Sequence, residues 1–107
     1  MYMNRIAIIG CGALSRTLIR IVKEKLDSQY TISGVFSRNT ENTKQTAARE
    51  HLAAYRSVQE MIEDRPDTII ELASADAVRD YGTLILQSGI NLIVASTGAL
   101  ADQTLLA

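Results

Sequence analysis

Two glycines separated by one residue form the most informative motif of the sequence. Gly10 and Gly12 follow directly on the apolar run Ile6–Ile9, and apolar residues then recur at three- and four-residue spacing from about Ala13 to Leu26. In this order of strand, turn and helix, the first glycine permits a tight turn and the second lets the backbone approach a pyrophosphate. The helix N-terminus would hold that anion through its N–H groups and partial positive charge. The alternative is a simple turn, but these flanking segments favour dinucleotide binding.

The residues beside the glycines fit such a phosphate turn. Ser15 stands where a third glycine or alanine is usual, and it is small enough to let the helix pack closely on the strand. Cys11, the only cysteine, has no partner for an internal disulfide, which indicates a reducing, cytoplasmic location. We interpret Cys11 as a small residue that lines the cofactor turn. A catalytic thiol is the alternative, but no base is adjacent to it.

A second polar group, Ser37-Arg38-Asn39, follows the β-branched and aromatic run Tyr30–Phe36. NAD sites usually carry an acidic residue at this strand end to bind the ribose hydroxyls, and the first acid here is Glu41. Ser37 could donate a hydrogen bond to a 2′-phosphate, and Arg38 could pair with its charge or stack on adenine. The segment therefore favours NADP over NAD as the cofactor. Two alternatives remain. Arg38 is a solvated loop residue, or Ser37 and Asn39 form hydrogen bonds with an unphosphorylated ribose.

Two more strand ends are small and polar. Ala73–Ala75 follows the predicted strand 68–72, and Ser96–Gly98 follows the predicted strand 91–95. In open parallel sheets, ligands bind beyond the carboxyl ends of the strands, at the switch point of the topology. We therefore expect Gly10–Leu14, Ser37–Asn39, Ala73–Ala75 and Ser96–Gly98 to lie together at one ligand-binding edge.

The whole chain reads as alternating strands and helices, which predicts an α/β fold. We expect a Rossmann-like parallel sheet of about five strands with helices on both faces. The remaining predicted elements are a helix capped by Thr40 and running to about Leu52, a short strand 53–55, a two-turn helix opened by a capping box at Ser57–Glu60, and a helix that begins at Ser74 or Asp76 and ends at Gly89. The last helix would carry Ala77, Val78, Tyr81, Leu84, Ile85 and Leu86 on or near its buried side.

Composition sets limits on function. The chain has 107 residues, 47% hydrophobic and 21% charged, with a net charge of −1, as in one ordinary soluble globular domain. This charge balance does not favour nucleic acid or an anionic membrane as a partner, and the sequence shows no membrane-spanning run and no signal peptide. We expect no metal site. His51, the only histidine, is interpreted as a surface or helix-end residue.

The second half of the chain resembles a known family. Ile70–Gly82, with its Glu-Leu-Ala-Ser segment leading into an Ala-Val helix, and Gly89–Asp102, with its Gly-Ala-Leu-Ala-Asp loop, are similar to the L-aspartate dehydrogenases. The resemblance covers nearly the whole chain, and the nucleotide-binding part of homoserine dehydrogenases is similar at lower specificity. It implies an NAD(P)-dependent enzyme that interconverts aspartate and the imine of oxaloacetate. It also implies roles for individual residues: Gly10, Gly12, Ala13 and Leu14 at the pyrophosphate, Ser37 and Arg38 at the adenosine ribose, Ala73 and Ser74 along the cofactor, and Ser96 and Thr97 near the nicotinamide.

In that family the chain continues into a second domain that supplies substrate contacts, the catalytic histidine and the dimer interface. We therefore interpret residues 1–107 as the NAD(P)-binding domain alone, truncated before the catalytic domain. Such a domain should be inactive by itself and should expose an apolar surface where the second domain packs. The alternatives are a stand-alone nucleotide-binding or regulatory module without catalysis, and a degenerate copy that has lost its ligand.

Charged residues outside these strand ends receive simpler interpretations. Asp76, Arg79 and Asp80 are expected to form the solvated face of a helix. Glu71 lies inside a predicted strand, where it either pairs with a neighbouring polar group or points to a strand edge. A general-base role for Glu71 is a further alternative.

Overall fold

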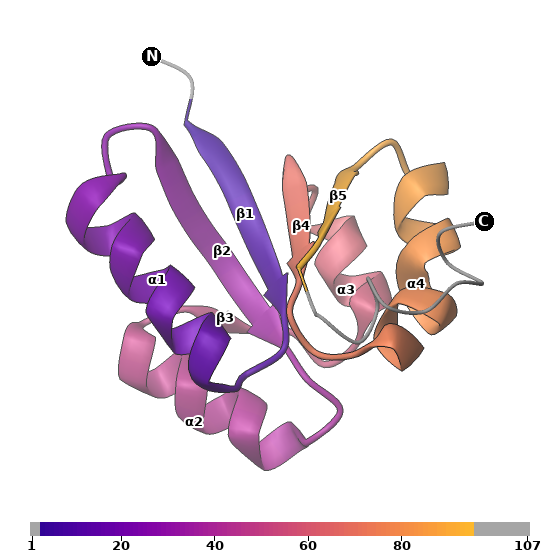
Figure 1. The fold of residues 1–107 in the computed structure, drawn as a ribbon, viewed down its shortest axis with the longest axis horizontal. Coiled ribbons are helices and arrows are strands. Elements are labelled where there is room, and N and C mark those ends of the chain that lie inside the picture. The colour runs from indigo at the N-terminus through magenta and orange to yellow at the C-terminus, as the bar shows by residue number, and fades with distance from the viewer. Residues whose placement is uncertain (1–2, 96–107) are drawn as a thin grey trace.

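Strands and helices alternate along the chain, in the order that the sequence predicts. The computed structural model describes residues 3–95 (Figure 1). Within them, five parallel strands form one sheet in the order β3-β2-β1-β4-β5. This confirms the predicted Rossmann-like sheet. The strands are β1 (Asn4–Ile9), β2 (Tyr30–Phe36), β3 (Ala53–Ala54), β4 (Thr68–Glu71) and β5 (Asn91–Val94), and the helices are α1 (Ala13–Lys25), α2 (Thr40–Glu50), α3 (Val58–Glu63) and α4 (Ala75–Gln87).

The central strand β1 separates two apolar cores. Ile6 and Ile8 pack into the core that contains side chains of α1 and α2, whereas Ala7 and Ile9 pack into the core that contains side chains of α3 and α4. Side chains alternate between the two faces along a strand, so an unbroken apolar run is what a strand buried on both faces requires. Helices therefore cover both faces of the sheet, as predicted (Figure 1).

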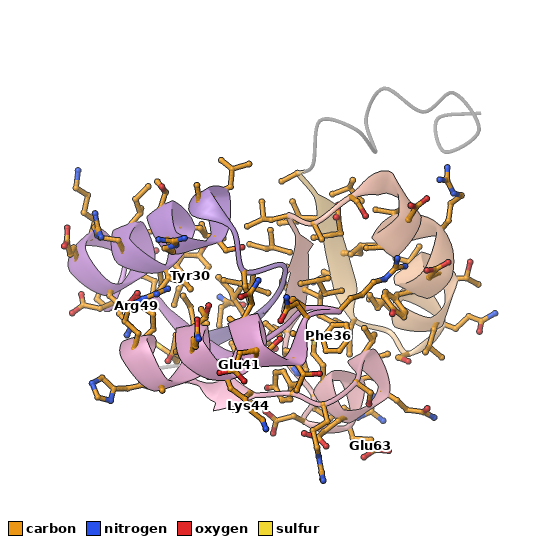
Figure 2. The ribbon with its side chains drawn as sticks, turned by 90° about the horizontal axis from the view of Figure 1, so that it is seen from below. Tyr30, Phe36, Glu41, Lys44, Arg49 and Glu63 are labelled. Carbon is orange, nitrogen blue, oxygen red and sulfur yellow. The ribbon has the colours of Figure 1, made fainter. Side chains whose placement is uncertain are left out.

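The strand register brings the carboxyl ends of the central strands level with one another. Ile9 at the end of β1 pairs with Phe36 at the end of β2 on one side and with Glu71 at the end of β4 on the other. The chain moves from β1 outward to β2 and β3, then returns to β4 and continues outward to β5. The topological switch point thus lies between β1 and β4. Figure 2, the view from below Figure 1, looks onto this edge, with Phe36 near its centre and Glu41 and Lys44 of α2 beside it.

Most element boundaries differ from the predicted ones by no more than two residues, and two details are corrections. Asn39, not Thr40, caps α2, because its side chain accepts a hydrogen bond from the backbone N–H of Asn42 at 3.0 Å. Leu84 and Leu86 of α4 are 40% and 61% exposed, so they do not belong to its buried side. On a helix with 100° between successive residues, both positions turn away from the stripe centred on the buried Ile85.

Helix α1 leaves several of its apolar residues exposed. Its buried residues are Ser15, Ile19 and Val22, whereas Leu14 is 59% and Ile21 is 41% exposed. The exposed side of α1 and the uncovered side of β4 and β5 form an apolar groove of about 350 Å³. The chain thus has the exposed apolar surface that the sequence predicts. The lining residues of this apolar groove are Leu14, Thr17, Leu18, Ile21, Ile70, Leu72, Ile93 and Ala95. Among the helices of residues 3–95, none combines the length and apolarity needed to cross a membrane.

Candidate functional site

The turn between β1 and α1 contains two glycines with different physical requirements. Gly10 has φ +119°, and a Cβ added to it would lie 3.2 Å from backbone atoms of Leu72 and Ala73. The fold itself therefore requires glycine at position 10. Gly12 has φ −87°, and a Cβ added there would meet nothing within 4 Å. Nothing in the described protein requires glycine at position 12, but a pyrophosphate that approaches the backbone closely would, so this turn fits the dinucleotide that the motif predicts.

The N-terminus of α1 differs from those of the other described helices. Side chains of Asn39, Ser57 and Ser74 cap α2, α3 and α4. The N-cap of α1 is Gly12, which has no side chain, and the first turn of α1 contains no acidic residue. The first amide groups of α1 lack a capping side chain, and the partial positive charge of the helix end is not neutralised locally. This arrangement suits an anionic ligand.

Ser15 and Cys11 support the turn from within. Ser15 is 1% exposed, and its hydroxyl donates a hydrogen bond to the carbonyl oxygen of Gly10 at 2.7 Å. This burial confirms that serine is small enough for α1 to pack closely at this position. Cys11 is half-buried and packs against the core beneath α1. Its environment fits a lining residue of the turn.

The polar groups at the end of β2 are already engaged with their surroundings. The Ser37 hydroxyl donates to the carbonyl oxygen of Asn39 at 2.9 Å and lies 2.8 Å from the Thr43 hydroxyl. Asn39 uses its side chain as the cap of α2. The guanidinium of Arg38 forms an ion pair with the carboxylate of Asp80 on α4. The side chain of Arg38 is 56% exposed, and its charge is paired with that of Asp80 at the carboxyl edge of the sheet.

At the end of β4, a buried carboxylate organises the backbone. Glu71 is 1% exposed, and one of its oxygens accepts hydrogen bonds from the amides of Ala73 at 2.7 Å and Ser74 at 2.6 Å. Ser74 in turn caps α4 by accepting from the amide of Ala77. Glu71 therefore pairs with neighbouring polar groups, and the alternative that it points to a strand edge is wrong because β4 lies between β1 and β5. Its carboxylate holds the turn that carries Ala73 and Ser74.

Backbone hydrogen bonds join the strand ends directly. Each bond joins a backbone amide to a backbone carbonyl oxygen: that of Gly10 to Phe36 at 2.7 Å, that of Leu72 to Ile9 at 2.9 Å, and that of Ala95 to Glu71 at 2.9 Å. Three of the four predicted segments, Gly10–Leu14, Ser37–Asn39 and Ala73–Ala75, therefore follow adjacent strand ends at one edge. The fourth, Ser96–Gly98, which contains the predicted cofactor residues Ser96 and Thr97, lies outside the described residues.

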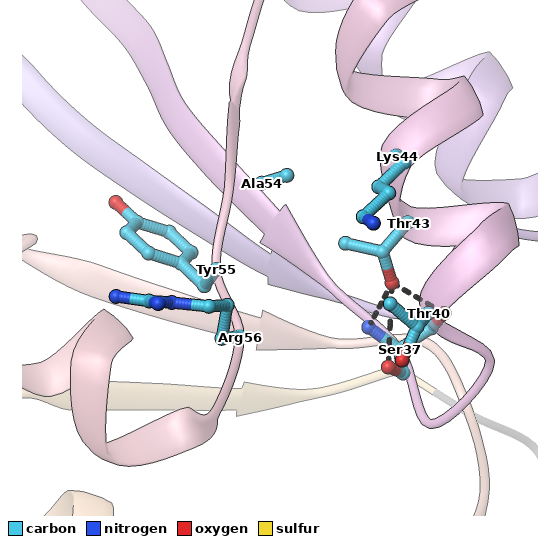
Figure 3. A pocket seen from close by; sticks show the side chains of 7 residues that line it. All are labelled: Ser37, Thr40, Thr43, Lys44, Ala54, Tyr55 and Arg56. Atoms are coloured by element: carbon cyan, nitrogen blue, oxygen red, sulfur yellow. Dashed lines mark hydrogen bonds between the residues drawn. The ribbon is translucent and has the colours of Figure 1, made fainter.

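A pocket of about 290 Å³ lies beside this edge, beyond the ends of β2 and β3 (Figure 3). It combines the basic side chains of Lys44 and Arg56 with hydroxyl groups from α2. No local motif predicts this pocket, because its walls come from α2 and from the residues after β3. Ser37 alone belongs to both the pocket and the predicted site. The lining residues are Ser37, Thr40, Thr43, Lys44, Ala54, Tyr55 and Arg56.

The described residues contain no cluster of three or more histidine, cysteine, aspartate or glutamate side chains that could hold a metal ion. His51 is exposed and forms the C-cap of α2 with φ 58°, in agreement with a helix-end role.

Comparison with known sequences places these features in a family context. The model of the family described as "Homoserine dehydrogenase, NAD binding domain" matches residues 10–107. The L-aspartate dehydrogenase of Methanospirillum hungatei is 34% identical over 100 residues, which is 94% of this chain and 38% of that enzyme. The L-aspartate dehydrogenase of Archaeoglobus fulgidus is 32% identical over 101 residues, again 94% of this chain and 38% of the enzyme. The chain therefore spans about two fifths of the length of these relatives.

Solved structures share the fold at low sequence identity. The WlbA dehydrogenase from Bordetella pertussis, determined in complex with NADH and UDP-GlcNAcA, has a TM-score of 0.78 at 15% identity over 87% of this chain and 28% of that chain. The UDP-N-acetylglucosamine 3-dehydrogenase GnnA from Acidithiobacillus ferrooxidans has a TM-score of 0.73 at 21% identity over 88% of this chain and 30% of that chain.

Proposed function

The chain belongs to the family of homoserine dehydrogenase NAD-binding domains, and from that premise we propose that it is the cofactor-binding domain of an NAD(P)-dependent L-aspartate dehydrogenase. The observation that carries the proposal is the Gly-Cys-Gly turn at the switch point of the sheet. There, Gly12 has no steric reason within the described protein to be glycine, and the helix that follows has no capping side chain. The similarity to L-aspartate dehydrogenases over 94% of the chain supports the choice of enzyme.

In this proposal, each strand end binds a different part of the cofactor. The turn and the start of α1 hold the pyrophosphate, the segment after β2 binds the adenosine ribose, and the Glu71-anchored turn after β4 lies along the cofactor. Arg38 and the absence of an acidic residue from 37 to 39 support NADP as the preferred form. The residues proposed to bind the cofactor are Gly10, Cys11, Gly12, Ala13, Leu14, Ser37, Arg38, Asn39, Ala73, Ser74, Ser96 and Thr97.

The proposed reaction oxidises the Cα–N bond of L-aspartate to the imine. The bound nicotinamide would supply the hydride acceptor. This chain would bind and orient the dinucleotide, and its close-packed strand ends would keep the phosphate and ribose subsites in fixed relative positions. We further propose that substrate contacts and proton transfer come from a part of the enzyme outside these 107 residues, in a cytoplasmic protein. The share of the relatives' length that this chain spans supports that division.

The apolar groove offers a surface for the remainder of such an enzyme. Leu14, Ile21 and Ile93 are each at least 41% exposed, and the groove that they line begins next to the phosphate turn. We propose that the catalytic part of the dehydrogenase packs there, because burying this apolar surface is favourable and would place substrate-binding residues beside the cofactor edge.

Titration of the chain with NADPH, NADH and ATP, followed by calorimetry or by nicotinamide fluorescence, tests the proposal. We expect both dinucleotides to bind more tightly than ATP, because only they bridge the phosphate turn and the far strand ends. NADPH should bind more tightly than NADH, and Arg38→Ala should remove that difference. If neither dinucleotide bound up to millimolar concentration, the proposed function would be contradicted.

A further inference from the structure

The ion pair between Arg38 and Asp80 lies across the edge at which the adenosine end of a dinucleotide would bind. We propose that Asp80 is a specificity-determining residue, which weakens the preference for NADPH by competing with the 2′-phosphate for Arg38. The proposal rests on the proposed function, since it concerns how the same site distinguishes two cofactors. Asp80, which the sequence alone places on the solvated face of a helix, would thereby act in cofactor selection.

The two residues are brought together by packing as well as by charge. Arg38 follows the end of β2, and Asp80 lies in the second turn of α4, 42 positions further along the chain. Next to them, the rings of Phe36 and Tyr81 meet edge to face, with centroids 6.1 Å apart and planes at 87°. Phe36 is 9% exposed, so this contact belongs to the core. The ring contact joins α4 to the end of β2 at residues close in sequence to Asp80 and Arg38, and so brings the segments that carry the two charges together.

The pair is weak enough for a ligand to displace it. The side chains of Arg38 and Asp80 are 56% and 52% exposed, so water and salt screen their attraction. A phosphate monoester carries a charge of roughly −1.5 to −2 at neutral pH and offers three acceptor oxygens, so it is a stronger partner for a guanidinium than one carboxylate. A bound 2′-phosphate would take Arg38 from Asp80.

Breaking the Arg38–Asp80 ion pair weakens the binding of NADPH but not that of NADH. When the 2′-phosphate pairs with Arg38, the Asp80 carboxylate loses its partner and remains near a dianion of like charge. NADH has no 2′-phosphate, so the Arg38–Asp80 pair can persist while NADH is bound. Asp80 therefore weakens NADPH binding and leaves NADH binding nearly unchanged, which brings the two affinities closer together.

The test compares dissociation constants of NADPH and NADH for the chain and its Asp80→Asn variant at low ionic strength. Asparagine keeps the shape of the side chain and removes its charge. We expect NADPH to bind about 1.4- to fivefold more tightly to the variant, because exposed ion pairs contribute about 0.2–1 kcal/mol and a factor of ten corresponds to about 1.4 kcal/mol. The dissociation constant of NADH should change by less than the NADPH gain, and the gain should shrink as salt is added.

Two further variants separate this mechanism from general effects of charge. In an Arg38→Ala background, Asp80→Asn should improve NADPH binding much less, because Asp80 acts through Arg38. Glu24→Gln removes an exposed carboxylate from the far end of α1 and should leave both affinities unchanged. Equal tightening of NADPH and NADH, or the same gain with Arg38 absent, would overturn the proposal.

The outcomes also separate this proposal from the proposed function. If both dinucleotides bind and Asp80→Asn leaves their affinity ratio unchanged, the role of Asp80 is wrong and the dinucleotide site stands. If neither dinucleotide binds to the chain or to the variant, both the proposed function and the role of Asp80 are overturned.

Discussion

Gly10 and Gly12 belong to one motif, but we expect replacing Gly10 to lower mainly the stability and replacing Gly12 to lower mainly the affinity for the dinucleotide. Gly10→Ala forces a side chain into a left-handed backbone at φ +119° and against the backbone of Leu72 and Ala73. We expect this variant to lose about 1–3 kcal/mol of stability. Gly12→Ala adds a methyl group in open space and should cost no more than about 1 kcal/mol, because alanine is a poorer N-cap than glycine, yet it should weaken dinucleotide binding about tenfold or more. Thermal unfolding and cofactor titration of both variants measure the two effects.

The NADPH affinity of Gly12→Ala decides whether the backbone at position 12 contacts the pyrophosphate. If Gly12→Ala bound NADPH as tightly as the unaltered chain, the backbone at position 12 would not approach the pyrophosphate, and the motif would be only a turn.

Tyr55 gives a residue-scale prediction about pH. Its hydroxyl donates a hydrogen bond to Asp64 at 2.5 Å and lies 2.9 Å from the Ser33 hydroxyl. Burial, and next the hydrogen bond to Asp64, raise the pKa of Tyr55 from 10.0 to about 12. Between pH 10 and 12 the unfolded chain releases the phenol proton more readily than the folded chain does. The contribution of Tyr55 to the free energy of unfolding is therefore fully present below pH 10 and is lost as the pH rises towards 12.

Urea unfolding between pH 8 and 11 checks this prediction. The free energy of unfolding should fall above pH 10 in the unaltered chain and fall less steeply in Tyr55→Phe. At pH 8 the variant should lose about 1 kcal/mol, because a partly buried hydrogen-bond network is removed. Equal slopes above pH 10 would show that Tyr55 does not carry the effect.

At the scale of elements, the pairing of β2 with β3 depends on a close approach at Gly34. A Cβ at this position would lie 2.6 Å from the Tyr55 ring and 2.7 Å from the carbonyl oxygen of Ala53. Gly34→Ala should therefore push the short edge strand away and cost about 1–3 kcal/mol. Gly82→Ala in α4 is the matched control, because its Cβ would make ordinary contacts at 3.6 and 3.7 Å, and alanine favours a helix. Melting temperatures should fall for Gly34→Ala and hold or rise for Gly82→Ala.

The elements could be predicted because their signals are local. The apolar run of β1, the glycine turn and the periodicity of the helices each lie within a few neighbouring residues, and the parallel sheet follows from their alternation. The cap of α2 was misplaced by one position, since Asn39 and Thr40 are both good capping residues and sequence alone does not rank them. The exposure of Leu84 and Leu86 depends on which elements surround α4, which periodicity does not specify.

Parts of the site could not be predicted because they depend on contacts between distant segments. The sequence does not specify the role of Glu71, since only the folded turn brings the amides of Ala73 and Ser74 onto its carboxylate. Nor does it distinguish Asp80 from other charges on a helix surface, because the ion pair with Arg38 joins segments that are distant in the chain. The strand ends themselves were predicted correctly for the three described segments, because parallel strands place their carboxyl ends at one edge.

At the scale of the whole molecule, substitutions in the apolar groove and in the core should affect stability differently, because the groove residues are half exposed. Ile93 is 51% and Ile21 is 41% exposed, so an Ile21→Gln/Ile93→Gln variant removes little buried surface. We expect each substitution to change stability by no more than about 0.5 kcal/mol, as is usual for surface positions, and to reduce binding of an apolar dye to the chain. Ile69→Ala, on the opposite face of the sheet with 0% exposure, is the control and should cost about 2–5 kcal/mol.

The groove variants also test the proposed packing of a catalytic part against this domain. Apolar residues grouped in one exposed groove suit a domain that packs against another part of its protein, which is what the proposal expects of Ile21 and Ile93. If the double variant retained its melting temperature and its NADPH affinity, the groove would be dispensable for the fold and for the cofactor, as the proposed interface requires. If the double variant melted as early as Ile69→Ala, the groove residues would belong to the core, and the proposed packing of a catalytic part in the groove would be wrong.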